Sequence, residues 1–375
     1  MSEQTAQHGE RFDVVVIGGG AAGLSGALTL ARARRSVVVV DDGRPRNAPA
    51  DGVHGYLGRE GVAPAELLDT GRAEVRGYGG QFRQGTVLAV EQESAGAAED
   101  GDVPGFAVRL TGGGVLRARR LLVATGLVDE LPDVAGLAGL WGSDVLHCPY
   151  CHGWEVRDQA IGVLNTGPLA VHQALLWRQW SEDVTLFLHT GPEPDDEEYE
   201  QLAARGIAVV DGEVSALERE DGRLTGVRLA GGTVVGCRAL AVASRMTARA
   251  GFLASLGLEP VELEKAGAVL GSQIPADPTG LTAVPGVWIA GNLASMTEQV
   301  AGSAAAGVRA AGALNADLIT EDTRRAVAAR RNVAARAGAP RNVATGIGAD
   351  PSPFGPAGME REVSERVLGT RRHGM

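Results

Sequence analysis

A glycine-rich turn near the N-terminus limits the folds that this chain can adopt. Gly18, Gly20 and Gly23 follow the short apolar run Val14–Ile17 and lead directly into a helical segment. A second apolar segment, "SVVVVDD", carries Asp41 at its end. A buried strand, a tight turn, a helix and a second strand form a βαβ unit, which requires a parallel sheet. The sequence therefore predicts an α/β fold.

The same turn has the residue spacing of a dinucleotide-binding site. Gly18 permits the tight turn, Gly20 lets the backbone approach a pyrophosphate, and Gly23 allows close packing of helix on strand. The N-terminus of the helix offers unpaired N–H groups to phosphates. Asp41 is placed to accept hydrogen bonds from a ribose. This pattern alone does not separate FAD from NAD.

Two later segments favour FAD. "LLVATG" (121–126) and "GVWIAGN" (286–292) each predict a buried strand that ends in a turn of small residues. Gln299 lies near the start of a long helix of small residues that follows the second of them. In two-domain flavoproteins such segments cross back over the cofactor, and a helix N-terminus stabilises negative charge on the reduced flavin.

A second strand, turn and helix begin near Ala160, in "QAIGVLNTGPLAVHQALLWRQW", and "DVTLFLH" supplies the next strand. A chain of 375 residues is long enough for two domains. We therefore predict two Rossmann-like, three-layer domains.

Composition excludes several classes of partner and site. The net charge of −11 argues against nucleic-acid binding. No apolar run approaches the about 18 residues that a membrane span needs, and the N-terminus is polar without a signal peptide. Three cysteines do not make a disulfide framework, which predicts a cytoplasmic location.

The stretch "HCPYCHGWE" (147–155) holds two of the three cysteines. Zinc needs four ligands, and Cys237 lies in an apolar strand where a buried residue is expected. Four ligands within six residues cannot easily surround a tetrahedral ion, so we predict no metal site. A Cys-x-x-Cys pair with neighbouring histidines is typical of redox catalysis, in which His147 and His152 can accept protons.

From about Phe12 to Ile319 the chain resembles the low-molecular-weight thioredoxin reductase family. The resemblance implies a homodimer and a discontinuous FAD domain (1–127 and 251–322). It also implies an inserted, degenerate pyridine-nucleotide-type domain (128–250) that carries the cysteine pair, with Cys151 toward the flavin and Cys148 toward the substrate. We expect residues 323–375, which are rich in Arg, Ala, Gly and Pro, to be a flexible tail.

The residues that this resemblance assigns to FAD come from five segments of the chain. They are Gly18, Gly20, Ala21, Ala22 and Gly23; Asp41 and Asn47; Ala124, Thr125 and Gly126; Gly291 and Asn292; and Gln299 and Val300. Asn292 stands where the family has Asp, and Asn can still form a hydrogen bond with a ribityl hydroxyl.

The second glycine-rich turn departs from the family pattern. Asn165 replaces its first glycine, and Pro168 removes a backbone N–H close to where a phosphate would lie. After His189, where the family has basic residues, this chain has the acidic run Glu193–Glu200. Acids repel a 2′-phosphate, which argues against NADPH and leaves NADH open. We expect this domain to keep its fold without its cofactor.

The chain retains the cysteine pair and the flavin-binding segments but not the NADPH-binding pattern. In this it resembles thioredoxin reductase-like dithiol oxidases, which close disulfides in small natural products of the gliotoxin and holomycin type. This resemblance implies a small dithiol substrate, O2 as electron acceptor and hydrogen peroxide as product. Two alternatives stay open: a disulfide reductase supplied by NAD(P)H or another donor, and a flavin redox sensor without turnover. Trp141, Trp154 and Trp288 are candidates to line an apolar substrate pocket.

Overall fold

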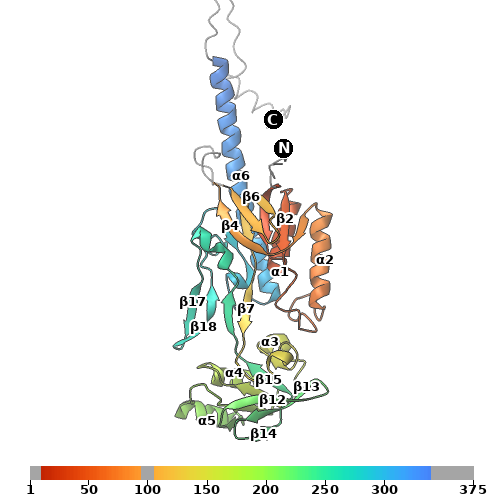
Figure 1. Ribbon diagram of the computed structural model, residues 1–375, viewed down its shortest axis with the longest axis vertical. Coiled ribbons are helices and arrows are strands. Elements are labelled where there is room, and N and C mark those ends of the chain that lie inside the picture. The colour runs from red at the N-terminus through yellow and green to blue at the C-terminus, as the bar shows by residue number, and fades with distance from the viewer. Residues whose placement is uncertain (1–9, 94–104, 339–375) are drawn as a thin grey trace, which may run out of the picture. The chain divides into compact units, whose positions relative to one another are not determined.

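The computed structural model of the chain (Figure 1) describes residues 10–93 and 105–338. It divides the chain into two units, residues 1–316 and 317–375. The first unit contains all of the sheets.

A seven-stranded sheet is formed by the first part of the chain and one late strand. Its order is β3-β2-β1-β6-β5-β4, with β19 paired to β6. The side chains of Val14–Val16 and Val38–Val39 are fully buried, as expected for parallel strands that are covered on both faces. Its strands are β1 (Arg11–Ile17), β2 (Val37–Asp41), β3 (Gln81–Gln84), β4 (Val87–Gln92), β5 (Phe106–Leu110), β6 (Val115–Val123) and β19 (Val287–Ile289).

Strand β6 has different neighbours along its length. Its first half runs antiparallel to β5, and its second half runs parallel to β19. The carboxyl ends of four parallel strands meet at one edge, where Gly18 N–H donates to Val40 (2.8 Å) and Ala124 N–H donates to Ile17 (2.7 Å). Ala290 N–H donates to Val123 at the same edge (3.0 Å). In doubly wound folds ligands bind at such an edge.

A five-stranded sheet is formed by residues that lie, in the sequence, between β6 and β19. Its order is β11-β10-β9-β15-β8, and every pair is parallel. Its strands are β8 (Val145–Leu146), β9 (Ile161–Leu164), β10 (Val184–Phe187), β11 (Ala208–Val210) and β15 (Ala239–Val242). A separate antiparallel sheet joins β12 (Val214–Glu220), β13 (Arg223–Leu229) and β14 (Val234–Val235).

The chain passes between the two parallel sheets on a pair of neighbouring strands. Strand β7 (Leu127–Glu130) follows β6, and β16 (Arg245–Ala248) follows β15. The two run antiparallel, with Asp129 opposite Met246. Strands β17 (Val261–Lys265) and β18 (Ala268–Gln273) complete this four-stranded sheet.

The helices are α1 (Ala21–Arg32), α2 (Pro64–Gly77), α3 (Pro149–His152), α4 (Ala170–Trp177), α5 (Asp196–Ala204) and α6 (Val300–Gly338). Short 3-10 helices occur at η2 (Ala138–Leu140), η3 (Gly251–Leu256) and η4 (Gly291–Leu293). None of the helices in the described part of the chain is both long and apolar enough to cross a membrane.

The predicted α/β class with two parallel sheets is confirmed, while the predicted domain boundaries stay predictions. Helix α6 extends beyond Asp322, so that the first part of the predicted tail is helical. The rest of that tail, residues 339–375, lies outside the described residues.

Asp144 anchors the segment that leads into the cysteine pair. It is 1% exposed and immediately precedes β8. Its carboxylate accepts hydrogen bonds from Arg223 Nε (3.0 Å) and Leu224 N–H (2.8 Å), and its carbonyl accepts one from Leu240 N–H (2.8 Å). The carboxylate thus ties β8 to the start of β13.

We expect Asp144→Ala to lower the free energy of unfolding by about 2–3 kcal/mol, because the buried Leu224 N–H loses its acceptor. Urea denaturation measures this change. The matched variant Asp69→Ala removes an acid that is 75% exposed and pairs with Arg72. Its effect should stay below about 0.5 kcal/mol. Equal effects of the two variants would show that Asp144 is not an anchor.

Candidate active site

The turn between β1 and α1 is shaped by close backbone contacts. Gly18 has φ +104°, and a Cβ there would collide with the Ala124 carbonyl oxygen. A Cβ on Gly23 would collide with the Gly18 carbonyl oxygen. Gly20, by contrast, has no heavy atom within 4 Å of its Cβ position, so a ligand can approach its backbone closely. These contacts match the three glycine roles of a pyrophosphate-binding turn.

A cavity of about 840 Å³ lies beside this turn. Its volume suits a large bound cofactor. Gly23, beneath the turn, is buried outside its lining. The other predicted site residues all line it: Gly18, Gly20, Ala21, Ala22, Asp41, Asn47, Ala124, Thr125, Gly126, His147, Cys148, Cys151, His152, Gly291, Asn292, Gln299 and Val300.

Asp41 lies at the cavity wall against the glycine turn. Its Oδ2 is 2.6 Å from the position that a Cβ of Gly19 would take, so Gly19 is a further position where a side chain does not fit. Arg72 on α2 approaches the same oxygen at 3.6 Å. The Asp41 carboxylate is 23% exposed and can still accept a ribose hydroxyl.

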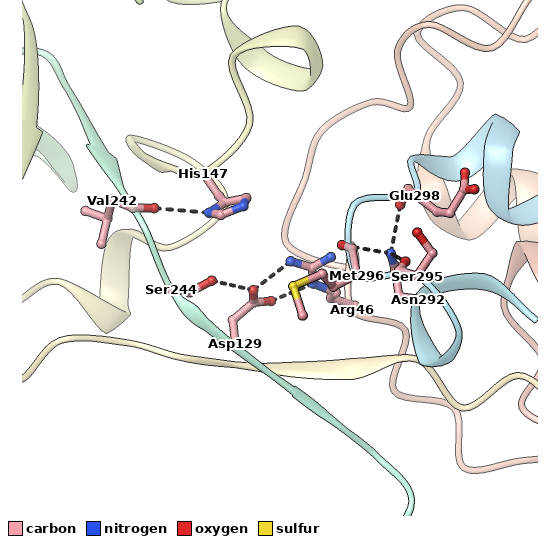
Figure 2. A network of polar contacts seen from close by, with 9 residues as sticks. All are labelled: Arg46, Asp129, His147, Val242, Ser244, Asn292, Ser295, Met296 and Glu298. Carbon is pink, nitrogen blue, oxygen red and sulfur yellow. Dashed lines mark hydrogen bonds and ion pairs between the residues drawn. The ribbon is translucent and has the colours of Figure 1, made fainter. Parts of the chain in front are cut away.

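The hydrogen bonds of the Asn292 side chain give a reason for Asn at a position where the family has Asp. Its side-chain amide donates to the backbone carbonyls of Ser295 (3.2 Å), Met296 (3.2 Å) and Glu298 (2.8 Å), as Figure 2 shows. A carboxylate has no hydrogen to donate to these carbonyls. Asn therefore orders the loop before α6 and keeps Oδ1 as an acceptor for a ribityl hydroxyl.

Cys148 and Cys151 are joined by a disulfide, with a Cα–Cα distance of 5.3 Å. Cys148 precedes the one-turn helix α3, and Cys151 lies within it. Gln299, which precedes α6, places its Nε2 3.9 Å from the Cys148 sulfur. The disulfide therefore lies in the same cavity as the glycine turn. The remaining cysteine, Cys237, is 3% exposed, and burial raises its pKa to about 12, as expected for a core residue.

His147 lies directly before the disulfide. Its Nδ1 is 3.2 Å from the Val242 carbonyl oxygen, to which it donates, so the neutral ring keeps Nε2 as an acceptor. Burial lowers the pKa of His147, and the positive charge of Arg46 lowers it further. The Val242 carbonyl and Asp129 act in the opposite direction without cancelling the shift.

His152 has a different environment. Burial also lowers its pKa, and Glu155 opposes that shift while His54 adds to it. His54 Nε2 is 3.5 Å from Glu155, and its Nδ1 is 2.6 Å from Glu60. His54 also lines the cavity, so carboxylates and a second histidine surround this side of the disulfide.

Comparison with known proteins assigns the fold and this site to a family. Residues 12–329 match the sequence profile named pyridine nucleotide-disulphide oxidoreductase. The chain belongs to the pyridine nucleotide-disulphide oxidoreductase family. Members of this family are oxidoreductases, and they are flavoproteins.

Individual relatives of this oxidoreductase include fungal and bacterial proteins. Thioredoxin reductase tcpT of Claviceps purpurea (strain 20.1) is 34% identical over 66% of this chain and 78% of its own length. Thioredoxin reductase sirT of Leptosphaeria maculans is 32% identical over 83% of this chain and 95% of its own length. The crystal structure of HlmI is 50% identical, covers 89% of this chain and 100% of its own, and has a TM-score of 0.79. The crystal structure of an oxidoreductase from Agrobacterium tumefaciens is 34% identical, covers 83% of this chain and 99% of its own, and has a TM-score of 0.75.

The family name implies a pyridine nucleotide, and the matching turn of this oxidoreductase fits one poorly. Asn165, at the end of β9, is 1% exposed. Its Nδ2 donates to Pro192 (2.7 Å), and its Oδ1 accepts the N–H of Gly167 (3.2 Å). A backbone donor that a phosphate needs is therefore engaged internally, and Pro168 has none to offer.

Among the described residues, the surroundings of the second turn also lack a cationic cluster. A cavity of about 490 Å³ there is lined by His189 and Arg245, among others. His189 Nδ1 accepts the N–H of Val214 (3.0 Å), and Arg245 pairs with Glu262 (2.7 Å). The acidic run contributes Asp195 and Glu198, which cap α5. His189 is thus a neutral acceptor, Arg245 is paired with an acid, and acids follow β10.

The structure adds residues that the sequence analysis did not select. They are Gly19, Arg46, His54, Asp129 and Glu155, which lie at or beside the cavity. A histidine within the glycine-rich segment "DGVHGYLGREG" was the available signal for His54. Of the three candidate tryptophans, Trp141 lines the cavity, Trp154 is 66% exposed, and Trp288 is buried in β19.

We expect Gly23→Ala to weaken flavin binding about tenfold or more, because its methyl group would displace the Gly18 carbonyl and such overpacking costs about 1–3 kcal/mol. Flavin absorbance and fluorescence of the purified protein, titrated with cofactor, measure this loss. The matched variant Gly77→Ala has open space at its Cβ position and should bind flavin as the unchanged chain does. Full binding by Gly23→Ala would contradict the role of this turn.

Proposed function

We propose that the chain is an FAD-dependent dithiol oxidase that closes an intramolecular disulfide in a small natural-product dithiol. Two protons and two electrons leave the substrate, and O2 takes them up as hydrogen peroxide. The observation that carries this proposal is the contrast between the two cavities. The first joins a dinucleotide turn to a disulfide, whereas the turn at the second has the Gly167 N–H engaged by Asn165 and lacks an N–H at Pro168.

The residues around the first cavity fit FAD. The backbone at Gly18–Ala22 would hold the pyrophosphate, Asp41 a ribose, and Asn292 the ribityl chain. The N-terminus of α6 at Val300 would face the flavin, where a helix dipole favours negative charge. When bound, FAD supplies the acceptor for the two electrons and transfers them to O2.

The cysteine pair would exchange disulfides with the substrate. A substrate thiolate attacks the Cys148 sulfur, the Cys148–Cys151 bond breaks, and Cys151 leaves as a thiolate. The second substrate thiolate attacks the substrate sulfur of this mixed disulfide and releases the cyclised product. Two electrons now reside on the reduced cysteine pair, and two protons have left the substrate. His147 and His152 are the nearby bases that can accept those protons.

We expect Cys148→Ser to abolish oxygen uptake in the presence of a dithiol such as dithiothreitol, because no sulfur remains for the first attack. An oxygen electrode measures this rate. Cys237→Ser is the matched control, since Cys237 is buried away from the cavity. It should keep the rate of the unchanged chain. Unaltered oxygen uptake by Cys148→Ser would exclude the disulfide as the entry point.

The same preparation separates the oxidase from a reductase. The unchanged protein is mixed anaerobically with NADPH, with NADH and with the dithiol, and flavin absorbance is followed. The oxidase predicts bleaching by the dithiol and none by either nucleotide. Rapid bleaching by NADPH or NADH would instead identify a reductase.

The rate of dithiol oxidation should fall at acid pH. A protonated imidazole cannot accept a proton, so activity is lost as the pH falls through the pKa of the histidine. Because burial lowers the pKa of His152 from 6.5, we expect this loss below that value. His152→Gln should lower the rate by about 10²-fold or more across the profile. The exposed His172 on α4 provides the control His172→Gln. An unchanged rate in His152→Gln would assign proton transfer to His147 or to solvent.

A further inference from the structure

A buried ion pair lies beside His147. Arg46 donates to Asp129 through Nε (2.7 Å) and a terminal nitrogen (2.6 Å), and Ser244 Oγ donates to the same carboxylate (2.7 Å). The Asp129 side chain is 7% exposed. Figure 2 shows His147 between the Val242 carbonyl and this ion pair. The two-pronged geometry is the strong form of an arginine–carboxylate contact.

The members of this network come from segments far apart in the sequence. Arg46 follows β2, whereas Asp129 lies on β7 and Ser244 directly precedes β16. Strands β7 and β16 are the two passages of the chain between its parallel sheets. The ion pair therefore joins the glycine-turn side of the cavity to the strands that lead to and from the disulfide.

The ion pair carries one positive and one negative charge, which shift the pKa of His147 in opposite directions. Burial alone would raise the pKa of Asp129, but the hydrogen bonds and charge of Arg46 and the bond from Ser244 hold it below its usual value. Asp129 therefore stays ionised. Among the described residues, Arg46 and Asp129 are the charged groups whose fields act on His147, and Cys148 is neutral in the disulfide.

We propose that Arg46 and Asp129 are positioning residues for His147: the Arg46 guanidinium, held in place by Asp129, adds to the burial of the ring in disfavouring a positive charge on it, so that Nε2 accepts a proton from a thiol at the Cys148–Cys151 disulfide. The Val242 carbonyl fixes the proton on Nδ1. The positive charge of Arg46 repels a positive charge on the imidazole ring, and the negative charge of Asp129 weakens this repulsion. This inference rests on the proposed function for its thiol substrate, whereas the charge coupling to His147 does not.

Because Arg46 and Asp129 carry opposite charges, we expect their single variants to shift the His147 pKa in opposite directions. Removing the positive charge in Arg46→Gln leaves Asp129 uncompensated, which raises the His147 pKa. Removing the negative charge in Asp129→Asn leaves Arg46 uncompensated, which lowers it. The double variant Arg46→Gln/Asp129→Asn restores a neutral pair, so its His147 pKa should lie between those of the single variants. It also avoids an unpaired buried charge, which makes it the variant most able to fold.

The experiment is an NMR titration of the imidazole Cε1–H signals in the holoenzyme, with His147 assigned by the loss of its signal in His147→Asn. The control Arg109→Gln removes an exposed arginine that pairs with Glu91 and lies away from the cavity. It should leave the His147 midpoint unchanged. In His152→Gln, where His147 is the remaining imidazole directly beside the disulfide, we also expect the acid limb of the residual dithiol oxidation to move with this midpoint.

Two results would overturn the proposal. One is a His147 midpoint that moves in the same direction in both single variants, or no further than in Arg109→Gln. The other is a His147 ring that is already protonated at neutral pH in the unchanged chain. Failure of the proposed function looks different: the titration shows opposite shifts, but dithiols support no oxygen uptake in any variant.

Discussion

The close approach of two backbone segments at the carboxyl edge of the large sheet determines the rest of the site. Gly18 lies against the Ala124 carbonyl, and Gly23 lies against the Gly18 carbonyl, with no space for a Cβ at either position. The glycine turn therefore packs directly against the backbone of Ala124 and Thr125, which follow β6. This contact brings residues 18–22 and 124–126 to one wall of the cavity and leaves Gly20 open. Without it, the N-terminus of α1 would not reach a bound phosphate.

Two asparagines show how the same residue type has opposite consequences at two turns. Asn292 donates to three carbonyls in the loop before α6 and keeps an acceptor at the cavity. Asn165 bridges Pro192 and Gly167 and thereby occupies a donor that a nucleotide phosphate requires. In the proposed oxidase, Asn292 would help to hold the cofactor, whereas Asn165 occupies the place of the first glycine in the second turn. In the proposed oxidase, this difference determines which electron carrier remains.

Much of the fold and of the cavity lining could be predicted, because the signals are local in the sequence. An apolar run, a glycine turn and an acid at the next strand end specify β1, α1 and β2. The parallel topology then places the other strand ends at the same edge. Helix α5 has a local signal as well, since Asp195 and Glu198 form a capping box. The acidic run was interpreted by its charge alone, and this helix was missed.

The ion pair of Arg46 and Asp129 could not be predicted in this way. Its partners are 83 positions apart, and "LVDELP" is a polar segment in which nothing local requires a buried carboxylate. Burial of Asp129 depends on how β7 pairs with β16, and its ionised state depends on Arg46 reaching it from the loop after β2. Charge environments of this kind depend on tertiary structure. The same holds for His54, whose carboxylate neighbours come from two different loops.

The two histidines beside the disulfide differ in how a proton can leave them. His147 has Nδ1 engaged by a backbone carbonyl and faces a closed ion pair. His152 lies in the field of Glu155, which approaches His54, and His54 in turn contacts Glu60, whose side chain is 63% exposed. This chain of carboxylates and imidazole leads from the cavity toward solvent. The proposed reaction removes two protons from each dithiol. His152 thus lies in the field of neighbouring carboxylates, whereas His147 holds one acceptor in a fixed tautomer.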